Sequence, residues 1–229
     1  MEELESKEKR ILVIIDTNQL GSYSGKKLSC NNYSFLETNK YLYQNIVNNF
    51  NYEKITKIHI ALPEIVLGEI LNQQVSCFNE DFSKLKNMFA KFSKLEGFEL
   101  NCAQLEYRQY LEEKMNNYLG AYSIIKIKNP PIEILPKLIK KVLLREKPFY
   151  KKENGVDSGF KDAIIWESIN EFVKENSYDK YFFLTNDLDF NDKILQEEFF
   201  KNSCANWPSW CPKWKQRPPP QGQFPRCQM

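Results

Sequence analysis

Apolar runs alternate with amphipathic segments along most of the chain. Runs rich in β-branched and aromatic residues predict four strands. They are 11–15, 57–62, 122–128 and 180–185. Apolar residues spaced three or four apart predict helices in the segments between and after them. They are 31–51, 63–74, a pair within 79–119 broken near Gly97, 131–145, 159–175 and 192–200.

Strands that alternate with helices predict an α/β fold, with a mainly parallel sheet in a three-layer α/β/α domain. We expect this domain to span residues 1–201, with the helical pair at about 79–119 as an insertion. Ligands of such sheets bind beyond the carboxyl ends of the strands. The residues that directly follow each strand are therefore the first candidates for a functional site.

The end of the chain has a different composition. Residues 202–229 are rich in Trp, Pro and Cys and show neither helical nor strand periodicity. Residues 201–229 carry five Lys or Arg and no acid, and because the chain has a net charge of +2, the remainder carries −3. We interpret residues 202–229 as an irregular tail, non-native or disordered. The alternative is a basic segment that stacks on nucleic acid through Trp207, Trp210 and Trp214.

Several classes of protein are disfavoured by simple counts. The single histidine, His59, excludes any mechanism that needs two imidazoles. The six cysteines contain no Cys-x-x-Cys pair, which argues against a zinc ribbon or a thioredoxin-type site. No apolar run approaches the roughly 20 residues of a membrane helix, and the acidic N-terminus does not resemble a secretion signal. These features predict a soluble, cytoplasmic protein with no membrane partner, and an enzyme of this kind would work mainly with carboxylates.

Five carboxylates fall at positions that the sheet would bring together. Asp16 follows the first strand, and Asp187 and Asp189 follow the fourth. Glu69 lies on the helix after the second strand, and Asp162 lies in the first turn of the helix at 159–175. Taken singly, each is also explained by helix-dipole or turn chemistry. Together they would repel one another unless a hard cation such as Mg²⁺ or Mn²⁺ offset their charge, and metal-assisted phosphodiester hydrolysis then fits without a histidine.

The same residues lie in four sequence blocks that resemble the signature blocks of PIN-domain nucleases. The blocks are Ile-Ile-Asp16-Thr-Asn18, Leu-Pro-Glu-Ile-Val-Leu-Gly-Glu69, Gly159-Phe-Lys-Asp162-Ala-Ile-Ile-Trp166 and Phe-Leu-Thr185-Asn-Asp187-Leu-Asp189-Phe190. They occur in the family's order between residue 11 and about 200. The third block is most similar to the larger bacterial PIN-like subgroup, not to the compact toxin type.

The resemblance implies a Mg²⁺- or Mn²⁺-dependent endoribonuclease with a near-parallel five-stranded sheet. By motif position, the catalytic and metal-ligating acids are Asp16, Glu69, Asp162 and Asp187. The supporting residues are Asn18, Thr185 and Asp189. In the two-metal form of the family, one ion activates water and the other stabilises the leaving 3′ oxygen. The number of ions differs among members and stays open here.

Further expectations concern partners. RNA, single-stranded or structured, is the expected substrate, and a dense basic zone leading to the Asp162 helix is the expected contact surface. Its predicted nucleic-acid-binding residues are Lys137, Lys140, Lys141, Arg145 and Lys161. The apolar stripe from Phe82 to Phe92 packs on the domain or forms a homodimer interface. An antitoxin or another regulator is a further expected partner.

Two other functions stay open. One is a nuclease that acts on single-stranded or structured DNA, since related folds do this. The other is a catalytically inactive PIN-like binding module, although such a module would be expected to have lost some of the four acids. A toxin or phage-defence role is the biological setting that the resemblance suggests. A PIN sheet normally ends with a strand after the last helix, and the tail offers no clear equivalent.

Overall fold

The computed structural model describes residues 9–20, 56–92, 106–151, 157–185, 187–190 and 192–203. Within them, four strands form a parallel sheet in the order β3-β2-β1-β6. Their bounds are β1 (Lys9–Ile15), β2 (Thr56–Pro63), β3 (Ile125–Ile127) and β6 (Lys180–Leu184). The α/β class with a mainly parallel sheet, predicted from the alternating pattern, is confirmed.

The central strand β1 explains the continuous apolar run. It pairs with β2 on one edge and β6 on the other, and Leu12 to Ile15 are at most 1% exposed, so both of its faces are covered as well. The register places Ile15 beside Leu184, and the backbone N–H of Asp16 donates to the Leu184 carbonyl at 2.9 Å. The carboxyl ends of β1 and β6 therefore meet at one edge of the sheet.

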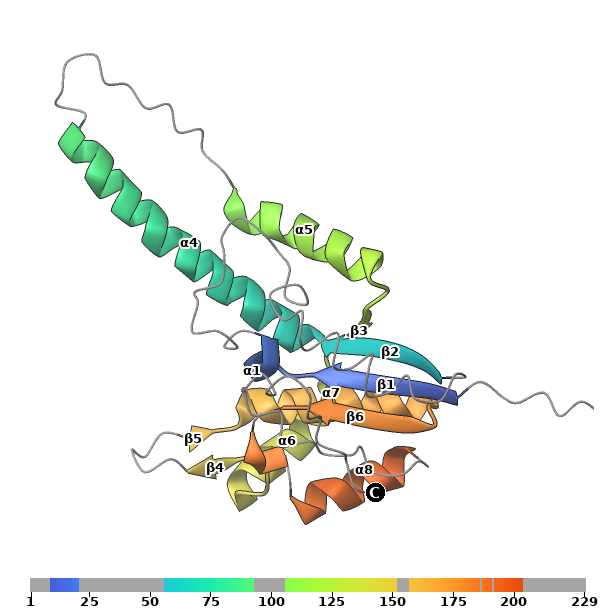
Figure 1. Cartoon of the computed structure of the whole chain (residues 1–229). Coiled ribbons are helices and arrows are strands. Elements are labelled where there is room, and N and C mark those ends of the chain that lie inside the picture. The colour runs from blue at the N-terminus through green and yellow to red at the C-terminus, as the bar shows by residue number, and fades with distance from the viewer. Residues whose placement is uncertain are drawn as a thin grey trace, which may run out of the picture.

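The helices lie around this sheet (Figure 1). They are α1 (Thr17–Leu20), α4 (Glu64–Phe92), α5 (Tyr107–Ala121), α6 (Leu135–Leu144), α7 (Phe160–Glu175) and α8 (Lys193–Ser203), with 3₁₀ turns η1 (Ile132–Ile134) and η2 (Leu188–Phe190). In Figure 1, α7 crosses behind the strands, α4 and α5 extend on the β2 and β3 side, and α6 and α8 lie on the β6 side. None of the described helices is long and apolar enough to cross a membrane.

The structure corrects the prediction that one helix ends near Gln74 and another begins near residue 79. A single helix, α4, runs from Glu64 to Phe92, because no glycine or proline interrupts the chain between Gln74 and Phe92. Its first half packs on the core, whereas Leu85 and Met88 in its second half are 47% and 56% exposed. In Figure 1 this second half extends well away from the sheet.

Two other differences concern short elements. The predicted strand at 122–128 shortens to β3, because Tyr122 caps α5 and Ser123 adopts a positive φ of 51°. A two-stranded hairpin, β4 (Tyr150–Lys151) with β5 (Asp157–Ser158), precedes α7 and was not predicted. Such short strands carry too few residues for periodicity to be read. The predicted helix at 31–51 and the tail at 204–229 lie outside the described residues.

Gly159 joins this hairpin to α7 and positions the start of that helix. Its φ of +102° suits only glycine, and a Cβ there would lie 2.3 Å from the Pro148 carbonyl oxygen. The helix that begins after it carries Asp162 in its first turn. The glycine of the third sequence block thus has a backbone role in placing that carboxylate.

Candidate active site

The Asp16 carboxylate lies at the carboxyl end of β1 and is held by two donors. The side chain is buried, at 6% exposure. The backbone N–H of Thr17 donates to Oδ1 at 2.7 Å, and the Thr185 hydroxyl donates to Oδ2 at 2.7 Å. The carboxylate is therefore fixed in orientation by residues that follow β1 and β6.

The Thr185 hydroxyl also connects the other motif residues. Its oxygen accepts from the Asn18 side-chain amide at 3.1 Å and from the backbone N–H of Asp187 at 3.0 Å. Asp187 Oδ1 in turn accepts from the backbone N–H of Asp189 at 2.8 Å, which closes a local turn. Asn18, Thr185, Asp187 and Asp189 thus form one hydrogen-bonded set around Asp16.

Glu69 reaches the same edge of the sheet from α4. Its Oε2 accepts a hydrogen bond from the Thr17 hydroxyl at 2.8 Å, and its Oε1 forms an ion pair with Lys161. The sequence interpretation did not single out Thr17. The signal was available, since Thr17 stands between Asp16 and Asn18 in the first block, but a threonine at a strand end gives no separate chemical clue.

The pKa values show that the acids of this edge interact. Burial raises the pKa of Asp16 to about 6, although the hydrogen bonds from Thr185 and Thr17 oppose the shift, and the charges of Asp162 and Asp187 add to it. An Asp whose ionised form is disfavoured at a sheet edge is unusual for a purely structural residue. The structure therefore places negative charge here beyond what the local hydrogen bonds offset.

The pKa of Asp162 is shifted in the same direction as that of Asp16. Burial raises its pKa, and the neighbouring negative charges, Asp187 first, raise it further, while Lys161 lowers it. Glu69 and Asp189 are also among the groups that raise it. Asp162 therefore interacts electrostatically with each of the other four predicted acids at a single edge of the sheet.

Among the residues that the structure describes, two lysines pair with members of this acidic cluster (Asp16, Glu69, Asp162, Asp187 and Asp189). Lys161 pairs with Glu69, and Lys147 pairs with Asp189. Lys147 stands in the predicted basic zone, but nothing in the sequence indicated that it would face a carboxylate. Because two ammonium groups face five carboxylates, the acidic cluster keeps an excess of negative charge.

The acidic cluster fits a divalent cation in its donor chemistry. Carboxylate oxygens are the preferred ligands of Mg²⁺ and Mn²⁺, and the mutual repulsion seen in the raised pKa values is what a cation would relieve. In the described part of the chain, no three histidine, cysteine, aspartate or glutamate side chains are already placed to hold an ion. Binding would require side-chain rotation and the release of Glu69 by Lys161.

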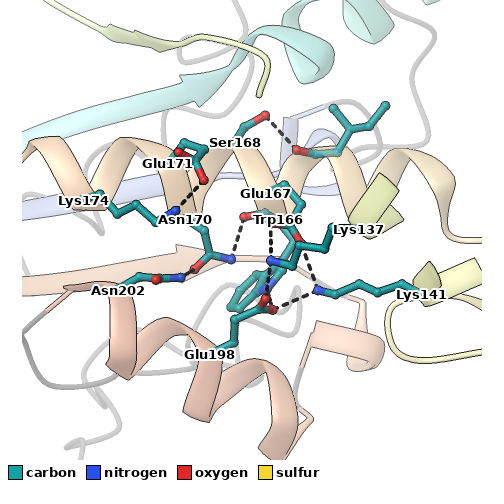
Figure 2. A network of polar contacts seen from close by, with 11 residues as sticks. Lys137, Lys141, Trp166, Glu167, Ser168, Asn170, Glu171, Lys174, Glu198 and Asn202 are labelled. Atoms are coloured by element: carbon teal, nitrogen blue, oxygen red, sulfur yellow. Dashed lines mark hydrogen bonds and ion pairs between the residues drawn. The ribbon is translucent and has the colours of Figure 1, made fainter. Parts of the chain in front are cut away.

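The predicted basic surface is partly corrected by the structure. Figure 2 shows Lys137 and Lys141 of α6 turned toward Glu167 of α7 and Glu198 of α8. Lys141 Nζ lies 2.9 Å from an oxygen of each glutamate, and Lys137 Nζ lies 2.7 Å from Glu167. The Trp166 indole N–H donates to Glu198 at 2.9 Å. These lysines neutralise glutamates between helices instead of forming a solvent-facing patch, because buried carboxylates require paired cations.

The remaining predicted basic residues are exposed. Lys140 and Arg145 lie on the solvent side of α6 and at its end, and Lys161 lies beside Glu69. Of the five predicted residues, Lys161 is therefore the one shown beside the acidic cluster.

Comparison with known proteins gives one match. A family model described as a PIN domain matches residues 13–190, which run from β1 to η2 and contain all five acids of the cluster. None of the curated proteins and none of the solved structures compared with the chain matches it.

Proposed function

The chain belongs to the PIN domain family, which is a family of nucleases, and we propose that it is a divalent-metal-dependent endoribonuclease. The observation that carries this proposal is the excess of negative charge at the carboxyl edge of the sheet, where burial and neighbouring acids raise the pKa of Asp16 to about 6. A structural site would be expected to pair such charges, as the α6–α7–α8 network does.

Asp16, Glu69, Asp162 and Asp187 are the residues that would hold the cation, with Asp189 as an auxiliary ligand. A bound Mg²⁺ or Mn²⁺ supplies activation of water and neutralisation of charge on the phosphate. The number of ions is left open, since neither the donor set nor the spacing selects one.

The other residues of the site fix the geometry of these ligands. Thr185 and the Thr17 amide hold both oxygens of Asp16, and the Thr17 hydroxyl directs Glu69 toward the same edge. Gly159 sets the start of α7 and with it the position of Asp162. Hydrogen bonds to metal ligands of this kind orient them and raise metal affinity.

RNA is the proposed substrate, on the strength of the sequence blocks, and DNA is the second candidate. Since the four acids of the blocks are all present and interact electrostatically, an inactive binding module is disfavoured. A toxin or phage-defence role, a homodimer and a regulatory partner remain proposals that rest on the family resemblance alone.

Cleavage of a labelled mixed-sequence single-stranded RNA, with a DNA of matched sequence, tests the proposal. The reactions contain Mn²⁺, Mg²⁺ or EDTA, and the Asp16→Asn/Asp187→Asn variant runs beside the wild type. We expect metal-dependent RNA cleavage that the variant lacks. Preferential DNA cleavage would replace RNA with the second candidate. No cleavage by folded protein that binds the metal would contradict the proposal.

A further inference from the structure

An open groove of about 590 Å³ runs along α4 beside the acidic cluster. Its floor carries Ile65, Gly68, Asn72 and Ser76, which follow one another at steps of three and four residues and so share one face of the helix. Glu69 also lines it. The groove therefore passes the proposed metal site at Glu69 and follows the helix in both directions, over about 18 Å in all, the length of twelve residues at 1.5 Å each.

The opposite wall of the groove comes from two other parts of the chain. Asn129 follows β3, and its backbone N–H donates to Glu64 Oε2 at 3.1 Å, which ties this wall to the first turn of α4. Lys161, in the first turn of α7, lines the groove beside Glu69, and its side chain is 60% exposed. A cation thus stands where the groove meets the acidic cluster.

Gly68 is the unexpected residue of the floor. Glycine is unfavourable within a helix compared with alanine, and Gly68 lies among the buried positions of α4, between Leu67 and Ile70. A Cβ at position 68 would meet no atom within 4 Å, so the packing of the chain does not require glycine here. A bare helix backbone beside a functional site is typical of the close approach of a ligand.

We propose that a single RNA strand lies in this groove, with Lys161 binding a phosphate next to the scissile bond and with bases against Asn72 and Gln73. The proposal rests on the proposed nuclease function. Amide side chains both donate and accept hydrogen bonds, as base edges require. Arg108 Nη2 donates to Asn72 Oδ1 at 2.5 Å, which fixes one of these amides at the groove.

The ion pair between Lys161 and Glu69 explains how the Lys161 ammonium group becomes available to an RNA phosphate. Without substrate, the ammonium group offsets the charge of Glu69. A divalent cation at the acidic cluster competes for that carboxylate, and the ammonium group then finds its counter-charge on a phosphate of the strand. Lys161 is therefore a substrate-binding residue in this proposal, not a metal ligand.

Filling the groove is the first test. Gly68→Leu places a side chain in open space, and Gly120→Leu on α5 is the matched control, because a Cβ at Gly120 also meets no atom within 4 Å. Binding of a fluorescein-labelled phosphorothioate RNA strand is measured by anisotropy in Mn²⁺. We expect Gly68→Leu to weaken binding roughly tenfold, the scale of losing one nucleotide's contacts. We expect Gly120→Leu to bind as the wild type does and both variants to bind Mn²⁺ equally.

Removing the cation is the second test, and it remains informative if Gly68→Leu folds poorly. Lys161→Gln is compared with Lys174→Gln, which removes a lysine from the last turn of the same helix, where it pairs with Glu171. We expect only Lys161→Gln to lower the salt dependence of strand binding, by about one in the slope of log affinity against log salt. We also expect it to tighten Mn²⁺ binding, since a competing cation leaves Glu69.

The outcomes separate this inference from the proposed function. Wild-type protein that cuts and binds RNA, with Gly68→Leu and Lys161→Gln binding the strand as the wild type does, would overturn the groove assignment and leave the nuclease intact. Weaker Mn²⁺ binding in Lys161→Gln would contradict the role given to its ion pair. Wild-type protein that neither binds nor cuts the strand would overturn both proposals.

Discussion

Helix α7 carries carboxylates into two environments that balance their charge in opposite ways. Near its start, Asp162 joins the acidic cluster, where five acids face two lysines among the described residues. Five residues later, Glu167 joins the ion-pair network between α6, α7 and α8 (Figure 2), in which Glu167 and Glu198 face Lys137 and Lys141. The two regions differ in charge balance and not in depth of burial alone.

The pKa values express this difference. At the acidic cluster, burial raises the pKa of Asp16 to about 6. In the network, burial alone would raise the pKa of Glu198, but hydrogen bonds from Lys137, Lys141 and Trp166 lower it to about 2. Buried carboxylates with paired cations hold helices together, whereas buried carboxylates in excess indicate a binding partner with positive charge.

The largest expected effect is the loss of cleavage when charge is removed from the acidic cluster. Asp16→Asn should lower the rate of RNA cleavage by about 10³-fold or more, because a metal ligand contributes several kcal/mol of transition-state stabilisation. The rate is measured under single-turnover conditions in saturating Mn²⁺. Lys174→Met, which removes an exposed lysine that pairs with Glu171 in the last turn of α7, is the control. Retention of more than a tenth of the wild-type rate by Asp16→Asn would remove this residue from the site.

Substitutions in the ion-pair network between α6, α7 and α8 should lower the free energy of unfolding instead of the cleavage rate. Lys141→Met leaves Glu167 and Glu198 with one lysine in place of two, and a broken buried pair costs about 3–5 kcal/mol. Urea unfolding should show a loss of about this size, against less than about 0.5 kcal/mol for Lys140→Met at an exposed position. A change of under about 1 kcal/mol in Lys141→Met would mean that the network adds little to stability.

The acidic cluster should oppose folding when no metal is present. The folded-state pKa of Asp16, about 6, lies above its ordinary value of 3.8, so the folded protein binds the proton more tightly than the unfolded chain. The stability that this group contributes is therefore present below pH 4 and is lost as the pH rises through about 6. Asp16→Asn should raise the free energy of unfolding by about 2 kcal/mol at pH 8 in EDTA, and by much less at pH 4.5.

The stability that Glu198 of the network contributes changes with pH in the opposite direction and over a lower pH range. Because the folded-state pKa of Glu198 is about 2, below its ordinary value of 4.5, its stabilising contribution is present above pH 4.5 and is lost as the pH falls toward 2. Urea midpoints of the wild type, Asp16→Asn and Lys141→Met, measured from pH 3 to 8, check both of these pH dependences. An Asp16→Asn variant that is less stable than the wild type at pH 8 in EDTA would contradict the sign assigned to the acidic cluster.

The smallest expected effect concerns the support of Glu69. Thr17→Val keeps the shape of the side chain but removes the hydroxyl that donates to Glu69 Oε2. Mn²⁺ affinity should fall by about tenfold, as for other hydrogen bonds that orient metal ligands. Thr17→Ser, which keeps the hydroxyl, should restore it. Equal affinity in Thr17→Val and the wild type would show that Glu69 needs no such support.

The sheet edge could be predicted from the sequence because the signals are local. A buried apolar run followed by Asp16, and a second followed by Thr185 and Asp187, place polar groups at the ends of neighbouring parallel strands. The paired lysines could not be predicted. Lys141 and Lys161 are alike in sequence, one on an amphipathic helix and one beside Asp162, and only the packing of α6 against α7 and α8 makes Lys141 internal.

The continuity of α4 and the hairpin before α7 were missed for related reasons. Between Gln74 and Phe82, Phe78 stacks on Tyr107 of α5 and Val75 packs against the core, which the sequence pattern of one helix cannot show. The hairpin depends on a register of two residue pairs. Elements that take their support from distant residues escape a local pattern.

Isothermal titration of metal-free protein with Mn²⁺ at pH 8, for the wild type and for Asp16→Asn/Asp187→Asn, tests the difference between the two regions most directly. The excess negative charge at the sheet edge predicts saturable binding to the wild type that the variant loses, while Lys141→Met, altered in the network, still binds. Equal binding by the wild type and the Asp16→Asn/Asp187→Asn variant, or no binding by folded wild-type protein, would contradict the assignment of this acidic cluster as a metal site.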